Sequence, residues 1–119
     1  MNGPRLVRAR ADVAVWEAGA GDPVLVLHGF PDAPIGMTPL VERLVAGGWR
    51  CLVPALPGYL PSQPVASYRT SAVAGDMLAV LDAYGIERAP VVGHDWGGCV
   101  ALDLGAEHPD RVTRVVSLA

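Results

Sequence analysis

A hexapeptide near the C-terminal end of the chain, Gly93-His94-Asp95-Trp96-Gly97-Gly98, has the spacing of a tight bend that displays one reactive side chain. It follows the short apolar segment 89–92 and precedes a stretch rich in small residues. A sharp strand-to-helix turn strains the backbone of its central residue, and side chains two positions away on either side would collide. Glycine at both of those positions removes the collision, so the bend displays Asp95 at the end of the predicted sheet.

The chemistry open to Asp95 follows from its position beside the amino end of the helix after it. The positive end of the helix dipole favours the ionised carboxylate. An ionised carboxylate attacks an sp³ carbon to form an ester and is poorly suited to acyl transfer. Asp95 could instead serve only as the helix N-cap, but capping needs no glycine on both sides. We therefore predict a nucleophile.

Metal binding is the other chemistry that these residue types suggest. The candidate pairs are His28 with Asp32 and His94 with Asp95. Neither pair has helical spacing or an obvious third ligand, so no metal site is predicted. No cofactor is expected either.

The elements that must position this bend alternate along the chain between apolar and amphipathic segments. Glycine and proline clusters separate them. Strands are expected in 6–17, 24–27, 50–53, 89–92 and 112–118, and helices from about 38 to 46, from 70 or 71 to 84, and from about 98 to 107.

The two earlier helices have recognisable start signals and apolar faces. Thr38 is expected to cap the first of them, with Pro39 at its first position. Thr70 or Ser71 is expected to cap the second, and Gly85 to end it. The apolar face of the second helix has a 3.6-residue period and consists of Val73, Met77, Val80, Leu81 and Tyr84.

Alternating strands and helices predict an α/β fold with a mostly parallel sheet and helices on both faces. The chain stops within its last predicted strand, after about the sixth strand, with no closing helix. Parallel sheets bury both faces, so we expect residues 1–119 to be the N-terminal part of one larger domain.

Composition excludes several classes of function for these 119 residues. All nine basic residues are arginine, which excludes a Walker-type phosphate loop and lysine Schiff-base chemistry. A net charge of −3 argues against nucleic-acid binding. No apolar run approaches the roughly 20 residues that a membrane span needs, and no secretory signal is evident. Two cysteines, Cys51 and Cys99, are interpreted as reduced packing residues of a cytoplasmic protein.

Two further motifs accompany the bend. His28-Gly29-Phe30-Pro31-Asp32 follows the predicted strand 24–27, and Pro54-Ala55-Leu56-Pro57-Gly58-Tyr59 follows the strand 50–53. With the bend at 93–98, these stretches resemble the N-terminal part of α/β-hydrolase-fold enzymes, in the branch that uses an aspartate nucleophile. Epoxide hydrolases and haloalkane dehalogenases belong to that branch. The resemblance extends from about residue 12 to the end of the chain.

The resemblance implies a role for each matching residue. Asp95 corresponds to the nucleophile, and the backbone N–H groups of Phe30 and Trp96 correspond to the two oxyanion-hole donors. His28 is expected to support the oxyanion loop by hydrogen bonds. Dehalogenases commonly have asparagine in place of Phe30 as a halide donor. A phenyl ring cannot donate a hydrogen bond, so an epoxide hydrolase is favoured and a dehalogenase is the alternative.

The family also needs a histidine with a carboxylate partner and an acid, usually a cap-domain tyrosine, all placed after the sixth strand. The cap domain and these C-terminal elements are expected to be absent from residues 1–119. His94 is expected to point away from Asp95, and His108 to lie on the surface. The isolated chain is therefore expected to react at most once with a small-molecule epoxide or related electrophile.

Two alternatives for assembly remain at this stage. The chain pairs with a C-terminal half to form a complete enzyme, or it is a non-catalytic truncated module that associates through its last strand.

For the remaining tyrosine and arginine residues, a structural role is favoured over a functional one. Surface packing is favoured over an active-site mouth for Tyr59 and Tyr68, and a solvated strand face is expected for Arg5, Arg8 and Arg10.

Overall fold

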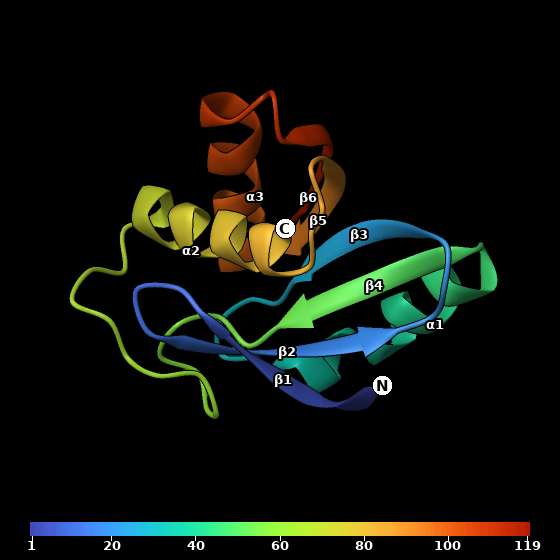
Figure 1. Cartoon of the computed structure of the whole chain (residues 1–119), viewed down its shortest axis with the longest axis horizontal. Coiled ribbons are helices and arrows are strands. Elements are labelled where there is room, and N and C mark those ends of the chain that lie inside the picture. The colour runs from blue at the N-terminus through green and yellow to red at the C-terminus, as the bar shows by residue number, and fades with distance from the viewer.

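The structure, a computed structural model, describes residues 1–119 apart from the side chain of Asn2. Strands and helices alternate after two opening strands, as the sequence predicted (Figure 1). The strands are β1 (Asn2–Arg8), β2 (Asp12–Ala18), β3 (Asp22–Leu27), β4 (Trp49–Pro54), β5 (Ala89–His94) and β6 (Val112–Leu118). The helices are α1 (Thr38–Ala46), α2 (Thr70–Ala83) and α3 (Trp96–Glu107), with a short 3₁₀ helix, η1 (Pro34–Met37), before α1.

The six strands form one sheet in the order β1-β2-β4-β3-β5-β6. β1 and β2 form an antiparallel pair, and β2 pairs antiparallel with β4. The pairs β4–β3, β3–β5 and β5–β6 are parallel. The expected α/β fold with a mostly parallel sheet is confirmed. Because β3 and β5 are adjacent and parallel, the loops that follow them meet at the same edge of the sheet.

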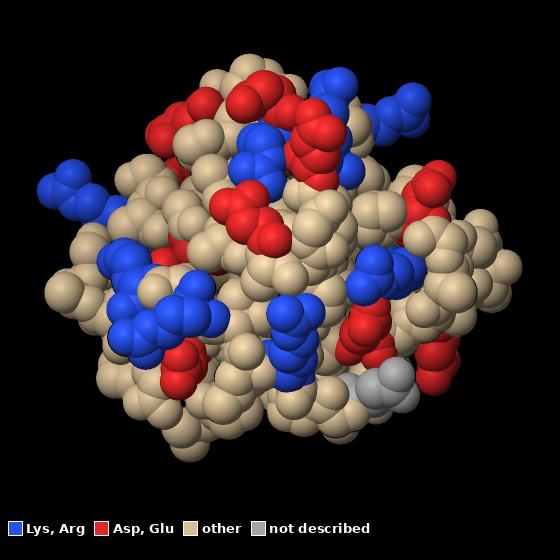
Figure 2. Space-filling model, viewed as in Figure 1, with Lys and Arg blue, Asp and Glu red and all other residues tan. Residues whose placement is uncertain are grey.

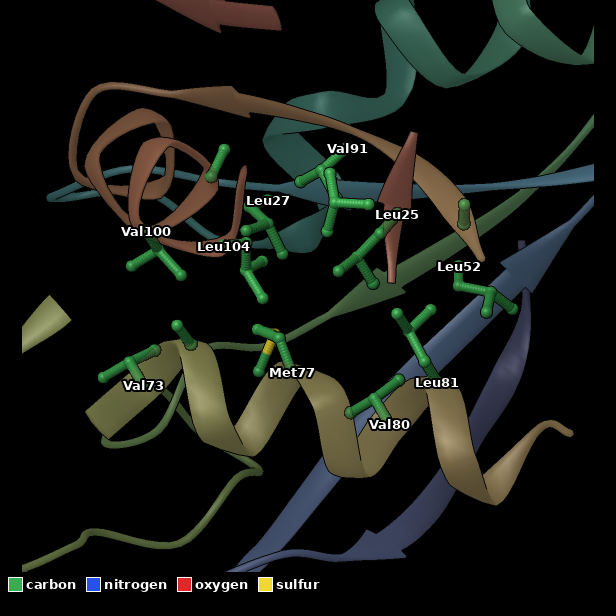
Figure 3. Packing of buried hydrophobic residues seen from close by; sticks show 14 of the residues in the cluster. Leu25, Leu27, Leu52, Val73, Met77, Val80, Leu81, Val91, Val100 and Leu104 are labelled. Atoms are coloured by element: carbon green, nitrogen blue, oxygen red, sulfur yellow. The ribbon is translucent and has the colours of Figure 1, made fainter. Parts of the chain in front are cut away.

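Helices cover the sheet from both sides. Successive side chains of β3 point to opposite faces of the sheet. Leu25 and Leu27 pack on the α2–α3 side, and Val24 and Val26 pack on the α1 side. Figure 3 shows the larger cluster, in which side chains of α2 point toward those of β3, β4 and α3. Its labelled members are Leu25, Leu27, Leu52, Val73, Met77, Val80, Leu81, Val91, Val100 and Leu104. The predicted apolar face of α2 is therefore core.

Helix starts differ from the sequence-based expectation. α3 begins at Trp96 instead of about residue 98, with Asp95 as its N-cap residue. The N-cap positions of α1 and α2 are Met37 and Arg69, and neither makes a side-chain cap hydrogen bond. The Thr38 hydroxyl donates instead to the Ile35 carbonyl oxygen, at 2.6 Å. The expected caps are wrong because Thr38 and Thr70 are already the first residues of their helices, one position after the N-cap.

Arg10 also departs from expectation, because it does not belong to a solvated strand face. It lies between β1 and β2 and forms a bidentate ion pair with Asp76 of α2, whose carboxylate is 2% exposed. The two contacts join Arg10 Nε to Asp76 Oδ1 at 3.0 Å and Arg10 Nη2 to Asp76 Oδ2 at 2.7 Å. A buried carboxylate needs such a partner, so this pair fastens α2 to the first hairpin.

Charged side chains of both signs are interspersed on the face seen in Figure 2. The described residues contain no helix with the length and apolar character that crossing a bilayer requires.

The two cysteines differ in their surroundings. Cys51 is buried in β4, as expected of a packing residue, and both cysteines are free. Cys99 is exposed on α3, so its interpretation as a packing residue is wrong.

Candidate active site

The turn between β5 and α3 holds Asp95 in a strained conformation, with φ 56° and ψ −120°. Asp95 is the one non-glycine residue with positive φ among those that the structure describes. The flanking glycines permit this bend. A Cβ atom on Gly93 would lie 2.2 Å from the Gly97 carbonyl oxygen, and one on Gly97 would lie 2.3 Å from that of His28. The steric reason predicted from the sequence is confirmed, because only glycine avoids these backbone contacts.

Hydrogen bonds on both sides of Asp95 fix the direction of the turn. The Asp95 N–H donates to the Leu118 carbonyl oxygen of β6, at 2.8 Å. The Asp95 carbonyl oxygen accepts from the N–H groups of Gly98 and Cys99, at 2.9 and 3.2 Å. Because its backbone is held at both ends, Asp95 has little freedom to relieve its strain by moving.

The Asp95 side chain is exposed and makes no side-chain cap hydrogen bond to α3. Its Oδ2 atom instead accepts a hydrogen bond from the Phe30 N–H, at 3.0 Å, from the loop that follows β3. The N–H groups of Phe30 and, secondarily, Trp96 hold the pKa of Asp95 below its ordinary value of 3.8. The Phe30 contact has hydrogen-bond geometry. The carboxylate is therefore ionised at neutral pH.

His28 is completely buried beneath this loop and both of its ring nitrogens are engaged. Nε2 accepts from the Leu56 N–H at 3.0 Å, so the proton is on Nδ1, which lies 3.0 Å from the Gly29 carbonyl oxygen. Burial lowers the pKa of His28, outweighing the hydrogen bond to Gly29 and the nearby charge of Asp32. The neutral ring thus links the loop after β3 to the loop after β4.

The other two histidines lie elsewhere. His94 is the last residue of β5 and is half-buried. His108 is the C-cap residue of α3, so the 12 residues of the helix separate it from Asp95 by about 18 Å. Among the described residues, no group of three His, Cys, Asp or Glu side chains could hold a metal ion.

A pocket of about 460 Å³ opens beside the turn that carries Asp95, with Trp96 of that turn in its lining. The residues that line it are Phe30, Pro57, Gly58, Tyr59, Tyr68 and Trp96. Tyr59 and Tyr68 therefore belong to the pocket, where the sequence favoured surface packing for both. The Gly58-Tyr59 turn after a buried strand was the signal in the sequence that could have indicated this. However, Tyr59 is far from residue 95 in the sequence, so the sequence does not show that both lie at one pocket.

The sequence of this chain is similar to those of known proteins. The sequence profile of the family described as alpha/beta hydrolase fold matches residues 22–119. The chain belongs to the alpha/beta hydrolase fold family. Within this family, the chain is 37% identical over 109 residues to epoxide hydrolase 3 of Siraitia grosvenorii, covering 88% of this chain and 34% of that protein. It is 38% identical over 102 residues to epoxide hydrolase B of Mycobacterium tuberculosis, covering 83% of this chain and 29% of that protein.

Solved structures of alpha/beta hydrolases agree with this assignment. An epoxide hydrolase from an endophytic Streptomyces superposes with a TM-score of 0.92 at 36% identity, covering 98% of this chain and 36% of that one. The chain thus spans about a third of the length of the relatives that it matches. The expected relationship to epoxide hydrolases is confirmed.

Proposed function

We propose that this chain is the nucleophile-bearing, N-terminal part of an epoxide hydrolase of the alpha/beta hydrolase fold. The observation that carries the proposal is the Asp95 carboxylate, exposed on a strained turn with one oxygen held by the Phe30 N–H. This arrangement leaves the second oxygen free to attack an electrophile. The similarity to epoxide hydrolases supports the choice of electrophile.

In the first step, the two carboxylate oxygens of Asp95 have different roles. Oδ1 attacks an epoxide carbon, forming a C–O ester bond while the bond from that carbon to the epoxide oxygen breaks. The epoxide oxygen leaves with the electron pair and takes up a proton, giving a hydroxyalkyl ester of Asp95. Oδ2 becomes the ester carbonyl oxygen and stays beside the amide of Phe30, 3.0 Å away in the free carboxylate.

In the second step, water attacks the ester carbonyl carbon and negative charge develops on Oδ2. In this scheme the N–H groups of Phe30 and Trp96 stabilise that charge, and their effect on the pKa of the ionised carboxylate supports this role. Collapse of the tetrahedral intermediate expels the diol and regenerates Asp95. The role of His28 in this scheme is to hold the Phe30 loop in place through its two hydrogen bonds.

Hydrolysis also needs a general base, and none of the three histidines suits that role. Both nitrogens of His28 are engaged, His94 belongs to the strand before the nucleophile, and His108 lies at the far end of α3. We therefore propose that a base, its carboxylate partner and the acid for ring opening come from further polypeptide. Residues 1–119 then form one part of a single catalytic domain.

Haloalkane dehalogenation is the alternative within the same chemistry. The indole of Trp96 lines the pocket as a halide-binding group would. The side chain at position 30 is a 70% exposed phenyl ring, which has no N–H or O–H to bind a leaving halide. The pocket therefore favours an epoxide, whose leaving oxygen remains part of the product.

Treating the isolated chain with a small reactive epoxide, such as glycidol, tests the proposal. We expect one addition per chain, mapped to Asp95 by peptide mass spectrometry, and no sustained formation of glycerol. Asp95→Asn should abolish the addition, whereas Asp110→Asn, at an exposed aspartate after α3, should retain it. Equal modification of both variants contradicts the nucleophile, and steady glycerol production contradicts the need for further polypeptide.

We propose that this further polypeptide covers the α1-side face of β5 and β6. A groove of about 930 Å³ lies there beside α1, and Val116 and Leu118 of β6 are 51% and 45% exposed in it. Parallel sheets of this class bury both faces. Co-purification with the remaining two thirds of a relative, expressed separately, should yield a complex, and Val116→Lys should weaken it. Self-association of the chain alone through β6 is the competing outcome, which sedimentation analysis distinguishes.

We also propose a cytoplasmic location. An exposed free thiol at Cys99 suits a reducing compartment. Cell fractionation that places the protein outside the cytoplasm contradicts this.

A further inference from the structure

The pocket beside Asp95 is distinctive because four of its six lining residues are aromatic: Phe30, Tyr59, Tyr68 and Trp96. The other two are Pro57 and Gly58, so no ionisable acid or base other than the two phenols lines it. At about 460 Å³, its size falls within the range of small-molecule sites. The carboxylate of Asp95 lies next to it, since Asp95 precedes Trp96 and its charge acts on Tyr59.

Tyr59 packs against His28, the buried residue that also holds the loop carrying Phe30. Its ring meets the buried ring of His28 edge-on, with centroids 4.7 Å apart and planes at 77°. On its other side lies the indole of Trp96, with centroids 6.2 Å apart. The Tyr59 N–H donates to the Leu56 carbonyl oxygen at 2.9 Å, and the Leu56 N–H donates to His28. Tyr59 is thus a preformed wall between the core and the pocket.

The loop that carries Tyr59 is held by a buried hydroxyl. Ser62 is 1% exposed, and its Oγ donates to the Ala55 carbonyl oxygen at 2.6 Å while accepting from the Ala14 N–H at 2.9 Å. The Ser62 N–H donates to the Tyr59 carbonyl oxygen, at 2.9 Å. These bonds fasten an otherwise irregular, proline-rich loop to β2, so the aromatic wall does not depend on a bound ligand for its shape.

Tyr68 and Phe30 form the open side of the pocket. The Tyr68 ring lies against Gly58, where a Cβ atom would come within 2.8 Å of ring carbon Cε1, and its hydroxyl accepts from the Val65 N–H at 3.2 Å. Tyr68 is 44% and Phe30 is 70% exposed. Two large aromatic surfaces thus face solvent next to the nucleophile, available for a ligand to cover.

We propose that this aromatic pocket selects uncharged, aryl-substituted substrates. The inference rests on the proposed epoxide chemistry and names the substrate class of the same site. The aromatic ring of the substrate packs among Phe30, Tyr68 and Trp96 while its epoxide carbon faces Oδ1 of Asp95. Aromatic pairs gain energy beyond the area they bury, which favours an aryl group over a saturated ring of similar size. The ionised Asp95 carboxylate disfavours anionic substrates.

Glycidyl ethers provide matched probes, because the ether link keeps the ring out of conjugation with the epoxide, and the rates with free acetate correct for the remaining inductive difference. We expect phenyl glycidyl ether to alkylate Asp95 about three- to tenfold faster than cyclohexyl glycidyl ether does. The 4-carboxyphenyl analogue should react more slowly than the phenyl compound. Rates are measured by intact-protein mass spectrometry on the whole chain, with the second-order rate constant as the readout.

Variants tie the preference to the pocket. Tyr68→Leu should reduce the phenyl-to-cyclohexyl ratio toward one, and Tyr68→Phe should retain it because the ring remains. Leu60→Ala is the matched control, since Leu60 belongs to the same loop and is 87% exposed but does not line the pocket. A wild-type ratio of one, or a ratio that Tyr68→Leu leaves unchanged, overturns the proposal.

Binding of the unreactive diol 3-phenoxypropane-1,2-diol separates the substrate class from the chemistry. NMR titration should show tighter binding than for the cyclohexyloxy diol, with shifts at Phe30, Tyr68 and Trp96. If Asp95 resists every epoxide but the phenoxy diol still binds preferentially, the proposed function fails and the aromatic site stands. If Asp95 reacts without ring preference and both diols bind alike, the substrate class fails alone. If Tyr68→Leu does not fold, the alkylation rates and diol titrations of the wild-type chain still test the proposed substrate class.

Discussion

The backbone nitrogen of Phe30 lies 3.0 Å from Oδ2 of Asp95, although 65 residues separate them in the chain. This contact joins the loop after β3 to the turn after β5, which are neighbouring parallel strands. It orients the carboxylate and lowers the pKa of Asp95. One hydrogen bond thus distinguishes the two carboxylate oxygens, and in the proposed mechanism the other oxygen, Oδ1, attacks.

The ionisation of Asp95 is the first testable consequence. Hydrogen bonds to the charged form lower its pKa, so ¹³C NMR titration of the Asp95 carboxyl carbon should give a midpoint below 3.8. A lowered folded-state pKa adds stability that is present above the unfolded value and is lost as the pH falls through the folded value. A midpoint at or above 3.8 contradicts the hydrogen-bonded arrangement of the carboxylate.

His28 should make stability depend on pH near neutrality. Its pKa is lowered by burial, so the unfolded chain takes up a proton below about 6.5 while the folded chain does not. Stability from this group is complete above 6.5 and declines as the pH falls from there toward the lowered folded value. Urea denaturation at several pH values measures this slope.

His28→Phe serves as the comparison, because it cannot titrate. It leaves the buried Leu56 N–H without its acceptor, so it should cost about 1–3 kcal/mol at pH 8. Its stability should fall less than that of the wild type between pH 7 and 5. Equal slopes for the two proteins would show that His28 is not the responsible group.

The Arg10–Asp76 ion pair should contribute more to stability than an exposed pair of the same residue types. Asp76→Asn removes the charge that neutralises Arg10 and should cost about 2–4 kcal/mol, with Arg10 partly solvated. Asp12→Asn breaks the Arg8–Asp12 pair, in which the side chains are 77% and 40% exposed, and should cost less than about 1 kcal/mol. Chemical denaturation compares them, and similar losses would refute the distinction.

Two glycine substitutions should have opposite effects. Gly97→Ala places a methyl group 2.3 Å from the His28 carbonyl oxygen, so it should destabilise the fold and displace the nucleophile turn. Gly75→Ala, on an exposed position of α2 with no atom within 4 Å, should stabilise by about 0.5–1 kcal/mol. Thermal unfolding and the rate of Asp95 alkylation measure both changes. A destabilised Gly75→Ala protein, or a tolerated Gly97→Ala, contradicts the contacts described here.

Local patterns in the sequence predicted the architecture and the strained turn at Asp95. The 3.6-residue period of α2 and the apolar run of β3 depend on short-range side-chain geometry, which a sequence displays directly. The strain at Asp95 follows in the same way from the collision that Gly93 and Gly97 avoid. These features involve residues a few positions apart, so no knowledge of the folded chain was needed.

Contacts between distant segments were decided only when the chain folded. The ion pair of Arg10 with Asp76, the aromatic pocket around Tyr59 and Tyr68, and the start of α3 at Trp96 all differ from what local patterns favoured. The aromatic pocket depends on the strand order β4-β3-β5, which brings the loops after these strands to one edge of the sheet, and the ion pair depends on the packing of α2 against the first hairpin. A single sequence does not record such long-range pairing, because the energy of each contact arises only once both segments are in place.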